Sequence, residues 1–321
     1  MVQKIILDMD PGIDDALAIM LAMRSPELQV EAITTVGGNV YVDKTSKNAL
    51  RILENMVYLK KKPEVAKGLA RPLSGKLVTA ECFHGEDGLG DSNLPEPEQA
   101  LSKEHADDLI IKKLLNSSSK KCEIALVTTG PLSNLASALL KKSEMAAKIS
   151  QLIMMGGAFG VTEYGFGNIT PAAEFNIYND PEAAKIVIGS EFPITAVSLD
   201  VTMNPSAWIT RREYDRIRSI KTKNAKLVAR IIRKRMESTG LLALHDPMGV
   251  AVAIDPSLVT RKKYFVEVET RGEYTRGQTI ADRREILPPQ TVRIGKPVNV
   301  CTSVLGEKFI DLFMERVIFQ S

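Results

Sequence analysis

The chain has 321 residues and a nearly balanced charge, with 42 Lys and Arg against 39 Asp and Glu and a net charge of +3. A dedicated nucleic-acid binder carries a much stronger basic excess, so that class is not expected. A hydrophobic content of 44% and a charged content of 25% are typical of a globular protein with a large core.

The cysteines and the N-terminus favour a protein of a reducing compartment. Cys82, Cys122 and Cys301 lie far apart and form no Cys-x-x-Cys pair, which argues against zinc ribbons and thioredoxin-like chemistry. The apolar run before Asp8 is too short for a secretory signal. No window reaches the ~18 apolar residues of a membrane span. The sequence therefore predicts a soluble, cytoplasmic protein with reduced thiols.

Short apolar runs alternate with segments of helical spacing along the first two thirds of the chain. The predicted strands are 4–7, 30–36, 123–128, 152–155 and 192–199. The predicted helices are 14–24, 43–56, 131–141 with proline in its first turn, one that starts at 180, and one that starts at 205. Asp180 is expected to cap its helix, with Pro181 at the first helical position. This alternation is typical of parallel strands that are covered on both faces.

The last third departs from this alternation. Strands are predicted at 264–269 and 291–294, followed by an amphipathic helix at 308–317. The chain contains no internal repeat, and the polar stretch 117–121 is too short to separate two domains. We therefore predict one α/β domain over residues 1–321, with a mostly parallel open sheet and helices on both faces.

Carboxylates and small residues collect where the predicted strands end. In an open α/β sheet, ligands bind outside the carboxyl ends of the strands. The segments that follow successive strands there are 8–15, Gly37-Gly38-Asn39, Thr128-Thr129-Gly130, Gly156-Gly157 and Asp200. Their coincidence predicts a polar site at one edge of the sheet.

Four aspartates within the segment 8–15 indicate a bound cation. Unpaired charges in a dry site cost several kcal/mol each, and oxygen ligands suit Ca²⁺ or Mg²⁺, with Ca²⁺ more tolerant of irregular geometry. The alternative is a solvated acidic turn that caps the helix starting near Asp14. An EF-hand loop is excluded because Ile13 and Ile19 occupy its glycine and glutamate positions, and no Walker motif occurs.

A competing enzyme hypothesis comes from Asp8-Met9-Asp10, which also resembles the first motif of haloacid-dehalogenase-type phosphatases. In those enzymes the first Asp is a phosphorylated nucleophile. Among the histidines, His245 stands beside Asp246 at a predicted helix start, where a local hydrogen-bonding role and a catalytic role are both open. His84 lies in a glycine-rich loop able to close over a site, and His105 is expected to be solvated.

Together these segments resemble the inosine-uridine-type nucleoside hydrolase family, over nearly the whole chain. The most specific part is the segment 8–16, which is very close to the N-terminal signature of that family. The supporting segments are Gly38-Asn39, His84-Gly85, 129–134, Met155-Gly156-Gly157, Gly167-Asn168, 173–177, 180–184 and His245-Asp246-Pro247. The phosphatase hypothesis accounts for the first segment alone.

The resemblance implies a Rossmann-like nucleoside hydrolase fold and hydrolysis of the N-glycosidic bond of ribonucleosides such as inosine and uridine. It implies a Ca²⁺ ion held by Asp10, Asp15, Asp246 and the carbonyl of Thr129. Asp10 would also accept a proton from the attacking water, and His245 would help the departing base accept one. The side chains implied to contact the nucleoside are Asp14, Asn39, His84, Met155, Asn168, Glu174 and Asn176. The resemblance further implies a homo-oligomer, a tetramer or a dimer.

Two segments depart from the family pattern. The stretch 158–167 is longer than in many members, so the shape of the 5′ side of the pocket is open. The stretch 236–243 lacks the aromatic residue that some members place against the base, so base preference is open. Trp208, the only tryptophan, is expected to be a packing residue. A non-catalytic, Ca²⁺-dependent nucleoside-binding protein is the remaining alternative, against which the presence of both Asp10 and His245 argues.

Overall fold

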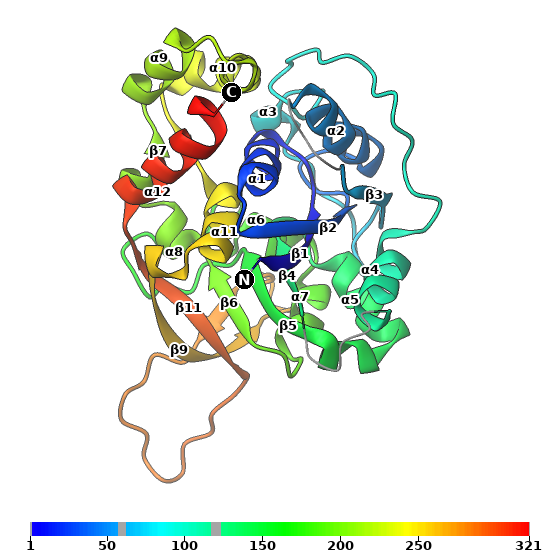
Figure 1. Cartoon of the computed structure of the whole chain (residues 1–321). Helices are drawn as coiled ribbons and strands as arrows, with labels where there is room; N and C mark the ends of the chain where they lie inside the picture. Colours follow the sequence, from blue (N-terminus) through cyan, green and yellow to red (C-terminus); the bar gives the residue numbers. More distant parts are fainter. Residues whose placement is uncertain (1, 57–61, 117–122, 321) are drawn as a thin grey trace.

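The computed structural model describes residues 2–56, 62–116 and 123–320. These residues form one α/β domain around a nine-stranded sheet with the strand order β10-β9-β11-β6-β5-β4-β1-β2-β3 (Figure 1). Its strands are β1 (Gln3–Met9), β2 (Leu28–Thr35), β3 (Glu64–Lys67), β4 (Ile124–Thr128), β5 (Ile149–Met155), β6 (Ile194–Val197), β9 (Val259–Val268), β10 (Thr279–Ala281) and β11 (Lys296–Val304).

The sheet is parallel from β11 to β3, and only the β10–β9 and β9–β11 pairs are antiparallel. A small second sheet pairs β7 (Trp208–Ile209) with β8 (Leu242–Ala243). The predicted mostly parallel open sheet is therefore confirmed. Because β1, β2, β4, β5 and β6 run the same way, their carboxyl ends meet at one edge.

Helices cover both faces of this sheet (Figure 1). They are α1 (Ile13–Arg24), α2 (Val42–Asn55), α3 (Glu81–His84), α4 (Ala106–Leu115), α5 (Ser133–Lys141), α6 (Phe175–Asn179), α7 (Pro181–Ile188), α8 (Leu199–Thr202), α9 (Arg211–Ser219), α10 (Lys223–Thr239), α11 (His245–Ile254) and α12 (Gly306–Phe313). Short 3₁₀ segments cover Ser143–Lys148, Pro205–Ala207 and Pro256–Leu258, and a π-helical segment, Met314–Phe319, follows α12.

Alternating side chains of the central strands supply two separate cores. On β1, Leu7 packs with α1 and α11 on one face, whereas Ile6 packs with α4, α5 and α7 on the other. All the side chains of β4 are buried, as expected for a strand covered on both sides. None of the described helices is long and apolar enough to cross a lipid bilayer.

Three predicted elements were wrong in place or extent. Residues 291–294 alternate in polarity like a strand but pair with nothing, Val292 is 74% exposed, and the last strand is instead β11. The helix predicted from Pro205 is a three-residue 3₁₀ turn, and α9 begins at Arg211. Pro131 precedes α5, whose N-cap is Leu132. Cys82 and Cys301 are free thiols, while Cys122 and the stretch 117–121 lie outside the described residues.

Candidate active site

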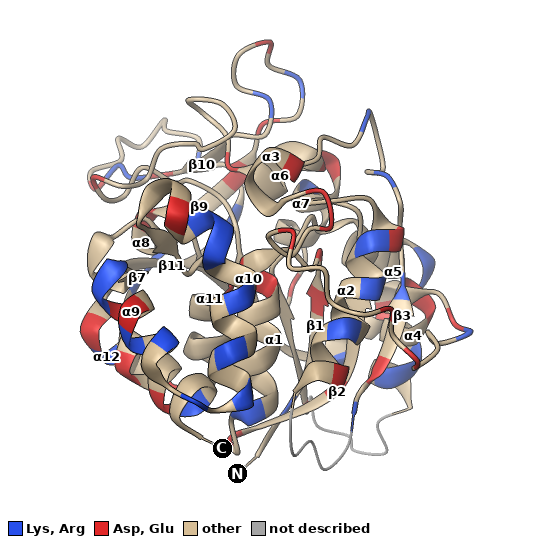
Figure 2. Cartoon of the chain, turned by 90° about the horizontal axis from the view of Figure 1, so that it is seen from above, with Lys and Arg blue, Asp and Glu red and all other residues tan. Residues whose placement is uncertain are grey.

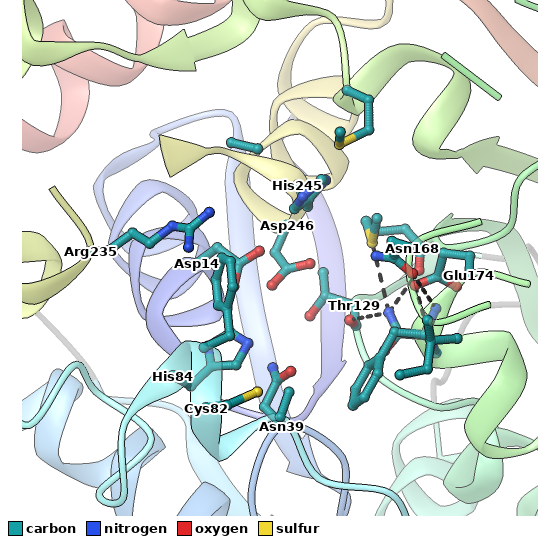
Figure 3. A pocket seen from close by; sticks show the side chains of 18 of the residues that line it. Asp14, Asn39, Cys82, His84, Thr129, Asn168, Glu174, Arg235, His245 and Asp246 are labelled. Atoms are coloured by element: carbon teal, nitrogen blue, oxygen red, sulfur yellow. Dashed lines mark hydrogen bonds between the residues drawn. The ribbon is translucent and has the colours of Figure 1, made fainter. Parts of the chain in front are cut away.

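A pocket of about 440 Å³ opens at the carboxyl edge of the sheet (Figure 3). Its floor and walls come from segments that follow β1, β2, β4 and β5, and from α3, α6, α10 and α11. Ten of the residues singled out in the sequence line it: Asp14, Asn39, His84, Thr129, Met155, Asn168, Glu174, Asn176, His245 and Asp246. The other two, Asp10 and Asp15, are completely buried beside it.

The helix starts of α1 and α11 bring three carboxylates together. Asp14, Asp15 and Asp246 each offer an oxygen within 4.8 Å of the other two. Asp15 is held in place because its carboxylate accepts hydrogen bonds from Asn39 Nδ2 (2.9 Å) and Thr129 Oγ1 (2.8 Å). The first turn of a helix is a favourable place for a negative charge, but three in one cluster still repel one another.

Asp10 has one tethered and one unpartnered oxygen. Its Oδ2 accepts a hydrogen bond from the Asn39 backbone N–H at 2.7 Å, while its buried Oδ1 has no partner among the described residues. A Cβ on Gly38 would overlap Oδ2, and one on Gly130 would lie 2.7 Å from Oδ1, so both glycines make room for this carboxylate. Burial and the nearby charge of Asp15 raise the pKa of Asp10 well above its usual range.

The cluster fits a hard cation. Burial and the charge of Asp15 raise the pKa of Asp14 to about 7, and burial with the charge of Asp14 raises the pKa of Asp246 well above its ordinary value. The carboxylates are thus costly to ionise without a compensating positive charge. The donors are all oxygens, and Thr129 adds a carbonyl whose only described hydrogen bond is with Asn176 Nδ2 (2.8 Å). Such a donor set suits an ion of the Ca²⁺ or Mg²⁺ type.

The opposite wall is organised by Glu174, the N-cap of α6. Its carboxylate accepts hydrogen bonds from the backbone N–H groups of Gly157 (3.0 Å), Asn176 (2.9 Å) and Ile177 (3.1 Å), and burial raises its pKa. Asn168 Oδ1 accepts a bond from the Phe175 N–H at 2.9 Å. These contacts fix polar side chains along one side of the pocket, where they can bind hydroxyl groups.

The two pocket histidines are held by single hydrogen bonds. His84 Nδ1 accepts from the Ile13 N–H at 3.0 Å, so its proton is on Nε2 and it forms a fixed part of the wall. His245 Nδ1 lies 2.8 Å from Thr202 Oγ1. Burial is the main cause that lowers the pKa of His84 to about 3 and that of His245 to about 4, with the charge of Arg235 contributing to both. His105, predicted to be solvated, pairs at the surface with Asp107.

Asp200 and Asp8 have structural roles. The Asp200 carboxylate accepts hydrogen bonds from the N–H groups of Phe159 (2.8 Å) and Val161 (2.7 Å), which anchors the start of the long 158–167 loop. Asp8 Oδ1 accepts from Thr34 Oγ1 (2.7 Å) and Asn134 Nδ2 (2.8 Å) and does not line the pocket. An Asp8 buried in this way is badly placed to be a phosphorylated nucleophile, which removes the main support for the phosphatase hypothesis.

The sequence interpretation missed part of the pocket wall. Trp208, assigned to packing, lines the pocket while its Nε1 donates to the Thr202 carbonyl at 3.0 Å. Phe83 and Arg235 line it as well. Arg235 could not be singled out because α9 and α10 contain many Lys and Arg residues (Figure 2), most of which are exposed.

Sequence comparison identifies close relatives along the whole chain. The model of the inosine-uridine preferring nucleoside hydrolase family matches residues 5–311. The pyrimidine-specific ribonucleoside hydrolase RihA of Shewanella sp. (strain MR-7) is 41% identical, over 98% of this chain and 96% of that protein. The protein of the same name from Salmonella schwarzengrund (strain CVM19633) is 40% identical over 99% of both chains.

Solved structures give the same result. A plant nucleoside hydrolase, the PpNRh1 enzyme, superposes with a TM-score of 0.90 at 33% identity, over 100% of both chains. A purine-preferring ribonucleoside hydrolase from Gardnerella vaginalis superposes with a TM-score of 0.86 at 33% identity, over 98% of both chains. The chain thus belongs to the inosine-uridine preferring nucleoside hydrolase family and is itself a hydrolase of ribonucleosides.

Proposed function

We propose that this chain is a Ca²⁺-dependent nucleoside hydrolase that converts ribonucleosides such as inosine and uridine into free base and ribose. The observation that carries the proposal is the buried carboxylate cluster at the floor of a 440 Å³ pocket whose opposite wall is amide-rich. A nucleoside offers the matching groups, which are ribose hydroxyls for the polar walls and an uncharged ring for the remaining space.

The proposed ligands of the ion are Asp10, Asp15, Asp246 and the carbonyl of Thr129. The free Oδ1 of Asp10 and the all-oxygen character of the cluster support this set, and Asp14 lies close enough to contribute charge. When bound, Ca²⁺ supplies positive charge that acidifies a water and orients the ribose 2′- and 3′-hydroxyls. Elemental analysis of protein purified without chelator should find about one calcium per chain; stoichiometric zinc would contradict the assignment.

The carboxylates and amides of the chain act on the sugar. Asp10 accepts the proton of the water that attacks the anomeric carbon. The ribose becomes oxocarbenium-like as the N-glycosidic bond breaks, and the nearby carboxylates stabilise that positive charge. We assign the ribose contacts to Asp14, Asn39, Asn168, Glu174 and Asn176, with Met155 against the sugar. Binding energy from these contacts positions the anomeric carbon for attack.

His245 serves the departing base in this proposal, and His84 lines the same pocket. With a pKa of about 4, the His245 ring is neutral at pH 7 and donates from one nitrogen only. If the Thr202 hydroxyl donates to Nδ1, the ring proton is on Nε2, from which the neutral ring can donate a hydrogen bond to the departing base. Thr202 would then be a positioning residue that selects the tautomer.

The test is incubation of the purified protein with a panel of ribonucleosides, followed by detection of free ribose and base. Release of ribose from inosine or uridine, abolished by exhaustive chelation and restored by Ca²⁺, would support the proposal. Binding of nucleosides without release would favour the non-catalytic alternative. Turnover of p-nitrophenyl phosphate instead would revive the phosphatase hypothesis. A homo-oligomer, dimer or tetramer, stays a prediction that size-exclusion chromatography with light scattering can check.

A further inference from the structure

The one Lys or Arg among the described pocket-lining residues is Arg235, near the end of α10. Its guanidinium carbon lies 4.2 Å from the centroid of the Phe83 ring, a stacking contact that fixes the plane of the group. Its Nε is buried and has no hydrogen-bond partner among the described residues. None of the described ion pairs involves Arg235, and burial alone lowers its pKa. The pocket wall thus contains an oriented cation whose donors are unused.

Arg235 lies at the end of the pocket opposite the proposed ribose wall. Figure 3 shows it beside His84 and His245, with the Asp14 and Asp246 carboxylates between it and the Asn168–Glu174 side. Its charge contributes to the lowered pKa values of both histidines, as expected for neighbours. A nucleoside whose sugar contacts Glu174 and Asn176 therefore directs its base toward Arg235.

We propose that Arg235 recognises the base: it donates hydrogen bonds to the exocyclic oxygen that uracil and hypoxanthine carry where cytosine and adenine carry an amino group, so that uridine and inosine are preferred over cytidine and adenosine. The inference rests on the nucleoside hydrolysis proposed above. Relatives described as pyrimidine-specific and as purine-preferring both resemble this chain, so membership of the family leaves the base to be decided by residues of this kind.

The chemistry of the bond cleavage explains why a guanidinium suits this position. When the C–N bond breaks, its electron pair leaves with the base, water delivers hydroxide to the anomeric carbon, and the water proton goes to Asp10. The negative charge of an oxo base spreads from the ring nitrogen onto the carbonyl oxygen until the base is protonated. Arg offers donors in a planar fork and no acceptor, so it stabilises an oxygen there and finds no partner in an exocyclic amino group.

The experiment compares two substrate pairs that each differ by one oxo or amino group, uridine with cytidine and inosine with adenosine. The ratio of kcat/KM within each pair is measured for the wild type, Arg235→Met and Arg235→Lys. The matched control is Arg233→Met, because Arg233 is exposed on the same helix and does not line the pocket. A charged donor to a base carbonyl typically discriminates by about tenfold or more.

We expect the wild type to prefer the oxo member of each pair by about tenfold or more. Arg235→Met should lose most of that preference, and Arg235→Lys should keep part of it. Arg233→Met should match the wild type. Inhibition by free ribose should stay unchanged in every variant, which separates base recognition from a folding defect. If the Arg235 variants lose kcat/KM equally on all four nucleosides, so that the ratios stay unchanged, the proposed role of Arg235 is overturned while the proposed hydrolysis stands. A wild type that releases ribose from no nucleoside would overturn the proposed function with it.

Discussion

Single carboxylates in this pocket differ in their surroundings more than their shared residue type suggests. Asp15 is fully engaged by Asn39, Thr129 and its own helix start, whereas Asp10 keeps one buried oxygen without a partner. A carboxylate satisfied by hydrogen bonds is suited to fixing geometry. A carboxylate with a raised pKa and a buried oxygen that has no hydrogen-bond partner is suited to accepting a proton. This difference is the structural reason for assigning the base role to Asp10.

The first residue-scale prediction concerns Asp10→Asn. The amide keeps the shape but removes the proton acceptor and weakens the cation site, so we expect kcat to fall by at least ~10² for every nucleoside. The measurement is steady-state kinetics with inosine and uridine. Asp255→Asn is a suitable control, because Asp255 is exposed at the end of α11 and an amide oxygen can still accept from the Ser257 N–H. A loss confined to one base would show that Asp10 is not the general base.

The second concerns His245→Ala. If the ring serves the departing base, its removal should slow inosine and uridine by about 10²-fold or more, since these bases leave poorly without a proton. A ribosyl substrate with p-nitrophenol as leaving group should be barely affected, because its anion is stable. Thr202→Val should give a weaker loss of the same pattern, as it removes the partner of His245 Nδ1. Equal losses on both substrate types would assign His245 to ribose binding or to structure.

At the scale of elements, the site depends on where strands end and helices begin. The buried, β-rich strands and the Asp180-Pro181 helix start could be predicted because their signals are local. The β9–β11 pairing could not, because a strand-like stretch such as 291–294, which pairs with no strand, looks the same in sequence as a segment that does. Arg235 escaped notice for a similar reason, since only tertiary packing against Phe83 distinguishes it from the exposed basic residues of α10.

Asp180 provides the prediction at this scale. Its carboxylate accepts from the Ala183 N–H at the start of α7 (3.1 Å) and also from Ser133 Oγ and the Leu73 N–H, so it joins three segments. Asp180→Ala should lower the free energy of unfolding by about 1–2 kcal/mol, the usual loss for a helix cap. Any loss beyond that would come from the hydrogen bonds with Ser133 and Leu73, whose donors are left without a partner. Urea unfolding measures it, with the exposed Asp311→Ala of α12 as control. A change equal to that of the control would mean the cap contributes nothing.

For the whole molecule, the sequence predicted the sheet, the edge that carries the pocket and ten of the residues that line it, because strand ends of a parallel sheet converge whatever the details of packing. The base end of the pocket was not predictable. Phe83, Trp208 and Arg235 all line the pocket, but they come from three distant segments and have no common motif. The central sheet and the proposed ribose contacts thus follow from local sequence signals, whereas the proposed base recognition by Arg235 depends on how α3 and α10 pack across the pocket.

The last prediction couples the carboxylate cluster to the stability of the entire domain. Burial and the charge of Asp15 raise the pKa of Asp14 to about 7 in the folded protein, from 3.8 for a free aspartate side chain. Without a cation, the folded state therefore binds more protons than the unfolded state between about pH 4 and pH 7, and this contribution to stability falls as pH rises through that window. Bound Ca²⁺ requires the ionised carboxylates, so its stabilising effect should grow over the same range.

At pH 8, Ca²⁺ at ~100 times its dissociation constant at that pH should stabilise the protein by about 2.7 kcal/mol, which corresponds to a rise in Tm of roughly 5 °C. The same Ca²⁺ concentration should stabilise the protein much less at pH 5. The measurement is the difference in Tm between samples with Ca²⁺ and with chelator at each pH. Taking this difference removes the contribution to Tm of groups such as His84, which titrate in the same way in both samples. Asp246→Asn should abolish the difference, because Asp246 belongs to the cluster, while Asp255→Asn should leave it intact. A Ca²⁺ effect of equal size at pH 5 and pH 8 would show that the raised carboxylate pKa values are not linked to the ion.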